Sequence, residues 1–287
     1  MNIWIEAARP KTLIASISPV LLGTVIALDS KALRLSVFLA TLIFALCVQV
    51  GSNFANDYID FLKGADTEER RGPRRLVQSG LVSVHKMRLV TLGIFCLAGM
   101  IGLYLMQIGG WQIGAVVLLS ILLGYYYTGG PYPLGYLGLG DLFVLIFFGP
   151  VATAATTYLQ TGTISSIAII AGLAPGLLST AILAMNNLRD VEQDRKVNKK
   201  TLPVRFGVGF GRWETVACLL LPSLIPFYLF RLTHTHLLSL TSMGYLALAI
   251  PLTRALFSDR ELALLFPKAG KILTLYTILF ILGWAIS

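Results

Sequence analysis

Long apolar runs restrict the folds open to this chain more than any other feature. Nine stretches are apolar over lengths that can cross the roughly 30 Å hydrocarbon core of a membrane. They cover residues 12–28, 35–62, 88–107, 112–128, 139–160, 166–194, 212–231, 237–256 and 268–286. With 56% hydrophobic and only 13% charged residues, the chain has too much apolar surface for a water-soluble domain. The sequence therefore predicts an all-α, polytopic membrane protein, a bundle of about nine transmembrane helices in a single domain covering residues 1–287.

The positions of the basic residues predict the orientation of these helices. If the N-terminus is cytoplasmic, the cytoplasmic segments hold 20 of the 23 Lys and Arg residues, leaving only Lys31, Arg34 and Arg231 outside. Cytoplasmic loops of membrane proteins are enriched in Lys and Arg. We therefore expect a multi-pass protein of the cell (inner) membrane with a cytoplasmic N-terminus. The net charge of +9 then reflects membrane orientation and not nucleic-acid binding.

Two polar rows interrupt the apolar runs at their predicted cytoplasmic ends. In a helix, residues three, four or seven apart share a face, so the side chains of each row project the same way. The rows consist of Asn53, Asn56, Asp57 and Asp60, and of Asn186, Asp190 and Asp194. Eight of the 14 acidic residues lie at these two motifs, and ionisable groups that face a bundle interior are usually functional. We expect the fold to bring both rows together at an active site that opens at the cytoplasmic face.

These side chains predict a magnesium site that acts on a phosphate. Carboxylate and amide oxygens are hard ligands, and Mg²⁺ usually completes its shell with water and substrate phosphates. The loops beside the rows carry the complementary charge, in Arg70, Arg71, Arg74, Arg75, Lys199, Lys200 and Arg205. Arg and Lys side chains bind phosphate. Each of these cations also has a simpler interpretation, as an orientation signal or a lipid head-group contact.

An aromatic loop at 125–141 connects two predicted helices and ends at Asp141. Tyrosines at this depth typically form an interfacial aromatic belt. A reaction that develops a cation beside a leaving diphosphate would also be stabilised by π faces near the breaking bond. Asp141 either orients a basic group or contacts a substrate.

A possible internal repeat relates the two polar rows. Asn56 and Asp60 recur as Asn186 and Asp190 at a constant offset of 130 residues. Because four helices separate the two rows, the repeat would be parallel and would relate helices 2–5 to helices 6–9.

The motifs on this pattern of helices resemble the UbiA superfamily of intramembrane prenyltransferases. The resemblance rests on Asn56-Asp57-x-x-Asp60, on Asp190-x-x-x-Asp194 and on the nine apolar runs. More narrowly, the family's 1,4-dihydroxy-2-naphthoate polyprenyltransferases of menaquinone synthesis have segments similar to GPRRLVQSG at 72–80, YTGGP at 127–131, NNLRDVEQDR at 186–195 and KKTLPVRFG at 199–207. The resemblance implies Mg²⁺-dependent transfer of a polyprenyl group from polyprenyl diphosphate to 1,4-dihydroxy-2-naphthoate, with decarboxylation to demethylmenaquinol.

The resemblance also implies roles for individual residues. The expected catalytic acids are Asp57, Asp60, Asp190 and Asp194, which hold Mg²⁺ together with Asn56 and Asn186. The expected diphosphate-binding residues are Asn53, Lys63, Lys200 and Arg205. From charge and position, and not from the resemblance, Arg74 and Arg75 in the Gly-Pro turn are the candidates for the carboxylate of the aromatic acceptor, and Tyr127 and Asp141 are further candidates for acceptor binding. The family's commoner first motif has a third acid where this chain has Gly64, and Asp66 follows two residues later, so the role of Asp66 stays open.

Three other functions fit parts of the pattern. A UbiA-type enzyme with another acceptor, such as 4-hydroxybenzoate, homogentisate or haem, would share the motifs. A membrane carrier would be expected to have acids near mid-helix, whereas these acids crowd one side. A phosphatidyl-alcohol transferase would need its acids in one compact motif with Gly and Arg, which the sequence lacks. The expected partners are polyprenyl diphosphate, an aromatic acid and membrane lipid, with no nucleic acid and no obligate protein partner.

Overall fold

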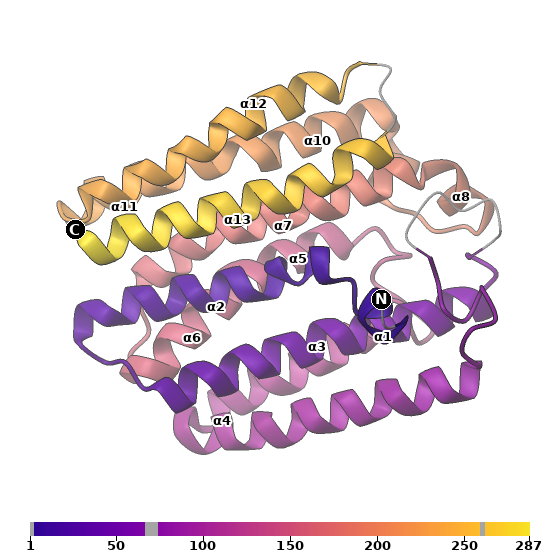
Figure 1. Ribbon diagram of the computed structural model, residues 1–287, viewed down its shortest axis with the longest axis horizontal. Coiled ribbons are helices and arrows are strands. Elements are labelled where there is room, and N and C mark those ends of the chain that lie inside the picture. Colours follow the sequence, from indigo (N-terminus) through magenta and orange to yellow (C-terminus); the bar gives the residue numbers. More distant parts are fainter. Residues whose placement is uncertain (1–2, 67–73, 259–261) are drawn as a thin grey trace.

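The computed structural model describes residues 3–66, 74–258 and 262–287, and over these ranges its regular structure is helical throughout (Figure 1). The helices are α1 (Ile3–Ala8), α2 (Ile14–Ala27), α3 (Leu35–Leu62), α4 (Val84–Tyr126), α5 (Gly140–Ile146), α6 (Ala152–Thr161), α7 (Ser166–Arg189), α8 (Val191–Lys196), α9 (Leu202–Phe206), α10 (Val208–Leu220), α11 (Leu224–Thr233), α12 (Leu246–Ala255) and α13 (Leu262–Ile286). Shorter segments link several of them, including η3 (Phe147–Val151) and η5 (Leu237–Tyr245). The predicted all-α fold is confirmed.

The number of membrane passes depends on a sharp break in α4 at Gly110. Seven of the described helices are long and apolar enough to cross a membrane, and the segments around α1 and α2 add a pair bent by 54°. Among the seven, α4 is interrupted at Gly110, where φ is 75° and ψ is −170°. A Cβ on Gly102 would collide with Val117, although a straight helix would separate these residues by about 22 Å, so the two arms of α4 are antiparallel. Seven helices, the bent pair and the second arm of α4 give nine passes over the described residues, as predicted.

Helix α7 lies at the centre of the bundle, where small residues allow close packing. Gly172 and Gly176 of α7 approach Gly149 in η3 so closely that a Cβ on any of the three would overlap backbone atoms. Small residues at helix contacts are typical of membrane bundles, because they let two backbones approach. On its other sides α7 packs against α2, α10 and α13. This packing holds the end of α7 at the same end of the bundle as the end of α3 (Figure 1).

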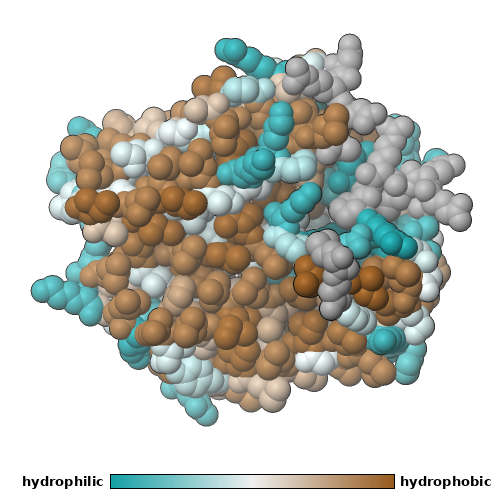
Figure 2. Space-filling model, viewed as in Figure 1, coloured by the Kyte–Doolittle hydropathy of each residue, from teal (hydrophilic) through white to brown (hydrophobic). Residues whose placement is uncertain are grey.

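The surface has the distribution that a membrane requires. Figure 2 shows an apolar belt across the middle of the visible face, with hydrophilic side chains gathered toward the two ends of the helices. Large apolar side chains are exposed along the spans, among them Leu92, Leu103, Leu118 and Leu282. The structure therefore describes a multi-span membrane protein. The cytoplasmic orientation of the end that carries α8, and the parallel repeat, stay predictions.

Candidate active site

Both polar rows face one cavity of about 550 Å³. The first row contributes Asn53, Asn56 and Asp60 from α3. The second contributes Asn186 from α7, Asp190 from the break between α7 and α8, and Asp194 from α8. The remaining charged wall consists of Glu6, Arg9, Lys11, Asp66, Arg75, Arg189 and Lys199. The fold thus joins two rows that are far apart in the sequence, and it surrounds them with basic residues.

The two amides of the first row already have partners in the chain. Asn53 Nδ2 donates to the carbonyl of Ala8 at 2.9 Å, which holds the bend between α1 and α2 over the cavity. Asn56 Oδ1 accepts a hydrogen bond from Thr128 Oγ1 at 2.9 Å, which ties α3 to the loop after α4. A metal ion bound by Asn56 Oδ1 would have to share or replace the contact with Thr128, whereas the contact of Asn53 uses its nitrogen and not its oxygen.

Asp57 lies apart from the cavity and anchors a loop. Its side chain is buried, and its two carboxylate oxygens accept hydrogen bonds from the backbone N–H groups of Leu76 and Val77, each at 3.0 Å. Charge-assisted bonds of this kind are stronger than those between neutral groups. Asp57 thus fixes the loop that carries Arg75, and it is not among the residues that line the cavity.

Arg75 links two acids of the cavity wall. Its Nη2 lies 3.4 Å from Asp60 Oδ2, and its Nε lies 3.2 Å from Asp66 Oδ2. Asp60 Oδ1 accepts a second hydrogen bond, from the hydroxyl of Tyr136 at 2.9 Å. Buried Nη1 of Arg75 has no hydrogen-bond partner among the described residues, so this donor is available to a bound anion. The neighbouring Arg74 is exposed and does not line the cavity, and Arg70 and Arg71 lie outside the described residues.

The second row is held by Arg189, a residue that the sequence analysis does not single out. Arg189 Nε and Nη2 donate to the two oxygens of Asp190 at 2.7 and 2.6 Å. The same Nη2 donates to Asn186 Oδ1 at 2.6 Å. The contact depends on a break in the backbone, because α7 ends at Arg189 and Asp190 is non-helical, with φ −97° and ψ 6°. The prediction of one continuous helix over 166–194 is therefore wrong at Asp190.

Asp194 and Lys199 form a further ion pair of the cavity, with Nζ 3.4 Å from Oδ1. Burial raises the pKa of Asp194 to about 6, although Lys199 opposes this shift. Burial acts to lower the pKa of Lys199, but the carboxylates around it, led by Asp194, leave that pKa raised. Burial and Asp60 also raise the pKa of the Tyr136 hydroxyl, which therefore stays protonated and donates a hydrogen bond to Asp60.

The predicted diphosphate-binding cations lie at different distances from the cavity. Lys63 Nζ donates to the carbonyl of Thr128 at 2.6 Å and lies 4.4 Å from the ring centroid of Tyr136, at the edge of the site. Lys200 and Arg205 are exposed, and neither lines the cavity. Arg205 instead donates to the carbonyls of Leu137 and Lys200, at 2.8 and 3.1 Å, and so joins two loops. The structure thus puts Lys199, and not Lys200, at the cavity.

Of the two candidates from the aromatic loop, only Tyr127 reaches the site. Tyr127 lines the charged cavity, whereas Asp141 is buried beside it. Asn187 Nδ2 donates to Asp141 at 3.4 and 3.5 Å, which connects α5 to α7. Asp141 is thus placed to position neighbouring groups, and not to touch a ligand in the cavity.

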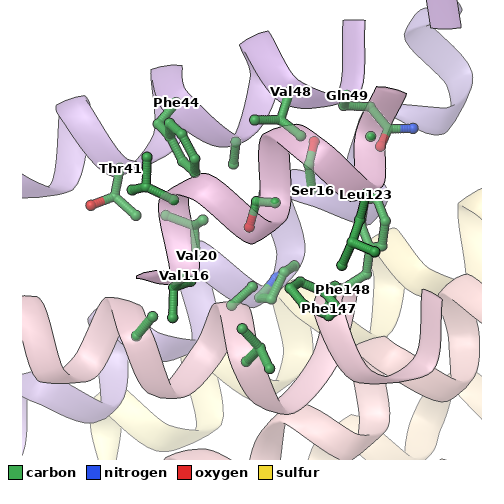
Figure 3. Close-up of a pocket in the computed structure, with 18 of the residues that line it drawn as sticks. Ser16, Val20, Thr41, Phe44, Val48, Gln49, Val116, Leu123, Phe147 and Phe148 are labelled. Atoms are coloured by element: carbon green, nitrogen blue, oxygen red, sulfur yellow. The ribbon is translucent and has the colours of Figure 1, made fainter. Parts of the chain in front are cut away.

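A second, apolar cavity of about 140 Å³ adjoins the charged one. Its walls come from α2, α3, α4, α5, η3 and α6, and Figure 3 shows Val20, Phe44, Val116 and Phe147 among the lining residues. Five residues line both cavities and mark their junction: Gln49, Ser52, Tyr127, Val144 and Phe148. A charged head and an apolar tail of one molecule can therefore lie in adjoining spaces.

The donor set of the charged cavity suits Mg²⁺ in chemistry but is engaged internally. The described part of the chain has no group of three His, Cys, Asp or Glu residues close enough to hold a metal ion. Each of Asp60, Asp190 and Asp194 is instead paired with a buried or half-buried cation of the chain. Oxygen ligands from Asp and Asn fit Mg²⁺, so these residues would hold it after their cations moved away.

Sequence reasoning missed several residues of this wall, and the reasons differ. Arg9 and Lys11 precede the first apolar run and were explained by orientation alone, although they line the cavity. Arg189 carried a usable signal, because an arginine within an Asn/Asp row at the end of an apolar run needs a partner. Tyr136 had no signal that separated it from the other tyrosines of its loop.

Comparisons with known proteins agree with this geometry. A model of the UbiA prenyltransferase family matches residues 16–282. The chain is 35% identical to the 1,4-dihydroxy-2-naphthoate octaprenyltransferase of Haemophilus influenzae over 300 residues, which cover 100% of this chain and 97% of that protein. It is 39% identical to the Escherichia coli protein of the same name over 241 residues, 81% and 77% of the two chains.

Solved structures show the same fold at low sequence identity. A UbiA homolog from Archaeoglobus fulgidus bound to DMAPP and Mg²⁺ has a TM-score of 0.67 and 16% identity, covering 99% of both chains. Digeranylgeranylglyceryl phosphate synthase has a TM-score of 0.60 and 17% identity, covering 99% of this chain and 98% of the other. The family match spans nearly the whole chain. This chain belongs to the UbiA prenyltransferase family.

Proposed function

We propose that this protein transfers a polyprenyl group from polyprenyl diphosphate to 1,4-dihydroxy-2-naphthoate, with loss of carbon dioxide, to give demethylmenaquinol in menaquinone biosynthesis. The observation that carries the proposal is the junction of the two cavities, where a charged space for a diphosphate opens onto an apolar space for its tail. The relatives at 35 and 39% identity, both named for this acceptor, support the choice of substrate.

The charged cavity suits the diphosphate of the donor. Arg75 offers an unpartnered Nη1, and Lys199 brings a protonated amino group to the same cavity. Both cations would stabilise negative charge that develops on the leaving diphosphate. Asp60, Asp190, Asp194, Asn56 and Asn186 would hold Mg²⁺, which when bound supplies Lewis-acid stabilisation of the same charge.

The junction suits the allylic carbon of the donor. Tyr127 and Phe148 present aromatic rings there, and such rings stabilise a nearby cation. The apolar side chains beside them exclude water, which would otherwise capture the developing cation. The electron-rich ring of the acceptor can then attack the allylic carbon, and departure of the acceptor's carboxylate as carbon dioxide restores the aromatic ring.

The location of the reaction is part of the proposal. The site would open to the cytoplasm in the cell (inner) membrane, with a cytoplasmic N-terminus. The distribution of 20 of 23 basic residues supports this orientation.

Purified protein in lipid nanodiscs tests the proposal. It would be incubated with Mg²⁺, labelled polyprenyl diphosphate and a panel of 1,4-dihydroxy-2-naphthoate, 4-hydroxybenzoate and homogentisate. We expect a prenylated product from the naphthoate alone, release of the naphthoate's carboxyl group as carbon dioxide, and no turnover in EDTA. Preference for 4-hydroxybenzoate would remove the acceptor assignment but keep prenyl transfer, and transport without a new carbon–carbon bond would instead indicate a carrier.

A further inference from the structure

We propose that Arg189 and Phe266 form the binding site for the acceptor's carboxylate and ring, and that this site becomes available only when Asp190 has released Arg189. The inference rests on the proposed function, because it concerns how an aryl carboxylate would bind in the same cavity. Neither residue belongs to the predicted site.

A carboxylate already occupies the proposed position. The Arg189 guanidinium holds both oxygens of Asp190, at 2.7 and 2.6 Å, in the two-point geometry that arginine adopts with carboxylates. The Arg189 side chain is 4% exposed and lines the cavity. The Asp190 side chain thus stands where the carboxylate of a substrate would bind.

An aromatic ring lies beside this guanidinium. The ring centroid of Phe266, on α13, is 5.4 Å from Arg189 Cζ, and Phe266 and Pro267 both line the cavity. A bicyclic aromatic acid can therefore place its carboxylate on Arg189 while its ring lies against Phe266 and Pro267. An offset or edge-to-face contact between such rings adds stabilisation to the charge interaction.

Arg75 is the sequence-based candidate for the acceptor's carboxylate, but its contacts suit a carboxylate less well than those of Arg189. Arg75 spans two different carboxylates through single contacts of 3.4 and 3.2 Å, so its guanidinium is not arranged around one carboxylate. Its loop position and its unpartnered Nη1 suit a phosphate oxygen better. Arg189 is the arginine whose present geometry matches an aryl carboxylate.

The same contacts make acceptor binding depend on a divalent cation. Asp190 and Asn186, which hold Arg189, are also the second-row residues expected to bind Mg²⁺. While both oxygens of Asp190 accept hydrogen bonds from Arg189, Asp190 binds a metal ion more weakly than a free carboxylate would. Arginine stays charged in proteins, so once released in this buried wall it requires another anion. By linkage, the metal should raise the affinity for the carboxylate, and the carboxylate should raise the affinity for the metal by the same factor.

Binding of 2-naphthoate to the protein in nanodiscs tests this inference without turnover. This probe is fluorescent, and it lacks the neighbouring hydroxyl that would let it chelate the metal itself. Empty nanodiscs correct for partition into lipid. For the wild type we expect Mg²⁺ to tighten 2-naphthoate binding at least about tenfold relative to EDTA. Uncharged 2-naphthol should show no such dependence.

Four variants separate the parts of the site. Arg189→Lys keeps the charge but removes the two-point geometry, and should abolish the gain from Mg²⁺. Phe266→Leu should weaken 2-naphthoate binding with and without Mg²⁺ alike. Asp190→Asn removes the competing carboxylate, so it should tighten 2-naphthoate binding in EDTA while it lowers turnover. Arg212→Gln is the matched control, because Arg212 lies over Phe257 at 5.9 Å but does not line the cavity, and it should bind 2-naphthoate like the wild type.

The outcomes distinguish this inference from the proposed function. If the wild type prenylates 1,4-dihydroxy-2-naphthoate while Arg189→Lys keeps both 2-naphthoate affinity and its Mg²⁺ dependence, the function stands and the inference is wrong. The same holds if Arg75→Lys, and not Arg189→Lys, removes the dependence. Absence of both turnover and 2-naphthoate binding in the wild type would overturn both. If Arg189→Lys does not fold, the opposite effects expected for Asp190→Asn and Phe266→Leu still decide the question.

Discussion

Single residues of the two rows differ in what they contact, although their motifs make them look equivalent. Asp57 and Asp60 lie on adjacent turns of α3, yet Asp57 holds backbone N–H groups and Asp60 faces the cavity. The spacing of a motif predicts which residues share a face, but a helix face is broad enough to meet both a loop and a cavity. Which acid meets which neighbour depends on the tertiary packing, so the sequence alone could not separate them.

Substitution of these two acids should have different consequences. Asp60→Asn removes a carboxylate proposed to hold Mg²⁺, so turnover should fall by at least about 100-fold, while Asp66 still pairs with Arg75. Asp57→Asn leaves one backbone N–H facing an amide N–H, which should cost about 1–3 kcal/mol of stability. Steady-state rates and thermal melts in one detergent measure both effects. A catalytic loss in Asp57→Asn at unchanged melting temperature would restore Asp57 to the metal site.

Two neighbouring lysines in the loop after α8, Lys199 and Lys200, allow a matched comparison of a residue in the cavity wall with an exposed one. Lys199 lies in the cavity wall 3.4 Å from Asp194, whereas Lys200 is exposed. Lys199→Gln should raise the KM for polyprenyl diphosphate about tenfold or more, because it removes a buried charge that faces the anion. Lys200→Gln should change it by less than about twofold. Equal effects of the two variants would support the original prediction for Lys200.

For helices, the sequence predicts well where the spans lie but predicts poorly where a helix is interrupted. The predicted spans 88–107 and 112–128 bracket Gly110, because polar and turn-forming residues interrupt the apolar run there. The break at Asp190 has no such signal, since the row reads as continuous helix. Consecutive residues of a helix point about 100° apart and do not face each other. The Arg189–Asp190 pair therefore requires the break, and could not be predicted from helical spacing.

Close packing of α7 against η3 makes a prediction about small residues. A Cβ on Gly176 would overlap the backbone of Leu145 and Gly149, so Gly176→Ala should destabilise the protein by about 1–3 kcal/mol. Gly99 in α4 has no atom within 4 Å of the corresponding position, and Gly99→Ala should be neutral or stabilising by up to about 1 kcal/mol. Thermal melts of both variants measure the difference. A lower melting temperature for Gly99→Ala than for Gly176→Ala would contradict the packing described for α7.

For the whole molecule, composition and hydropathy were sufficient to predict the architecture. A chain in lipid must satisfy its backbone hydrogen bonds within each span, so long apolar runs have little choice but to form helices. The helical spans follow from that constraint. Pairing among the charged side chains does not, because it depends on distances between helices that no local pattern encodes.

The orientation of the whole molecule in the membrane can be tested by labelling single cysteines. In a background with Cys47, Cys96 and Cys218 replaced by Ala, Ser83→Cys and Thr163→Cys place single thiols in exposed positions in two different loops. The distribution of Lys and Arg puts residue 83 in the cytoplasm and residue 163 outside. An impermeant maleimide should label Thr163→Cys in intact cells, and Ser83→Cys only after lysis. The reverse pattern would invert the predicted topology.

The internal ion pairs have a consequence for the end of the catalytic cycle. The two cations proposed for the diphosphate, Arg75 and Lys199, each lie 3.4 Å from an acid of the same chain, Asp60 and Asp194 respectively. A diphosphate product bound to these cations competes for them with the neighbouring acids. This competition weakens the binding of the product. As it departs, each cation returns to its own acid and not to an empty, poorly solvated space. The arrangement favours rapid discharge of product over tight retention of it.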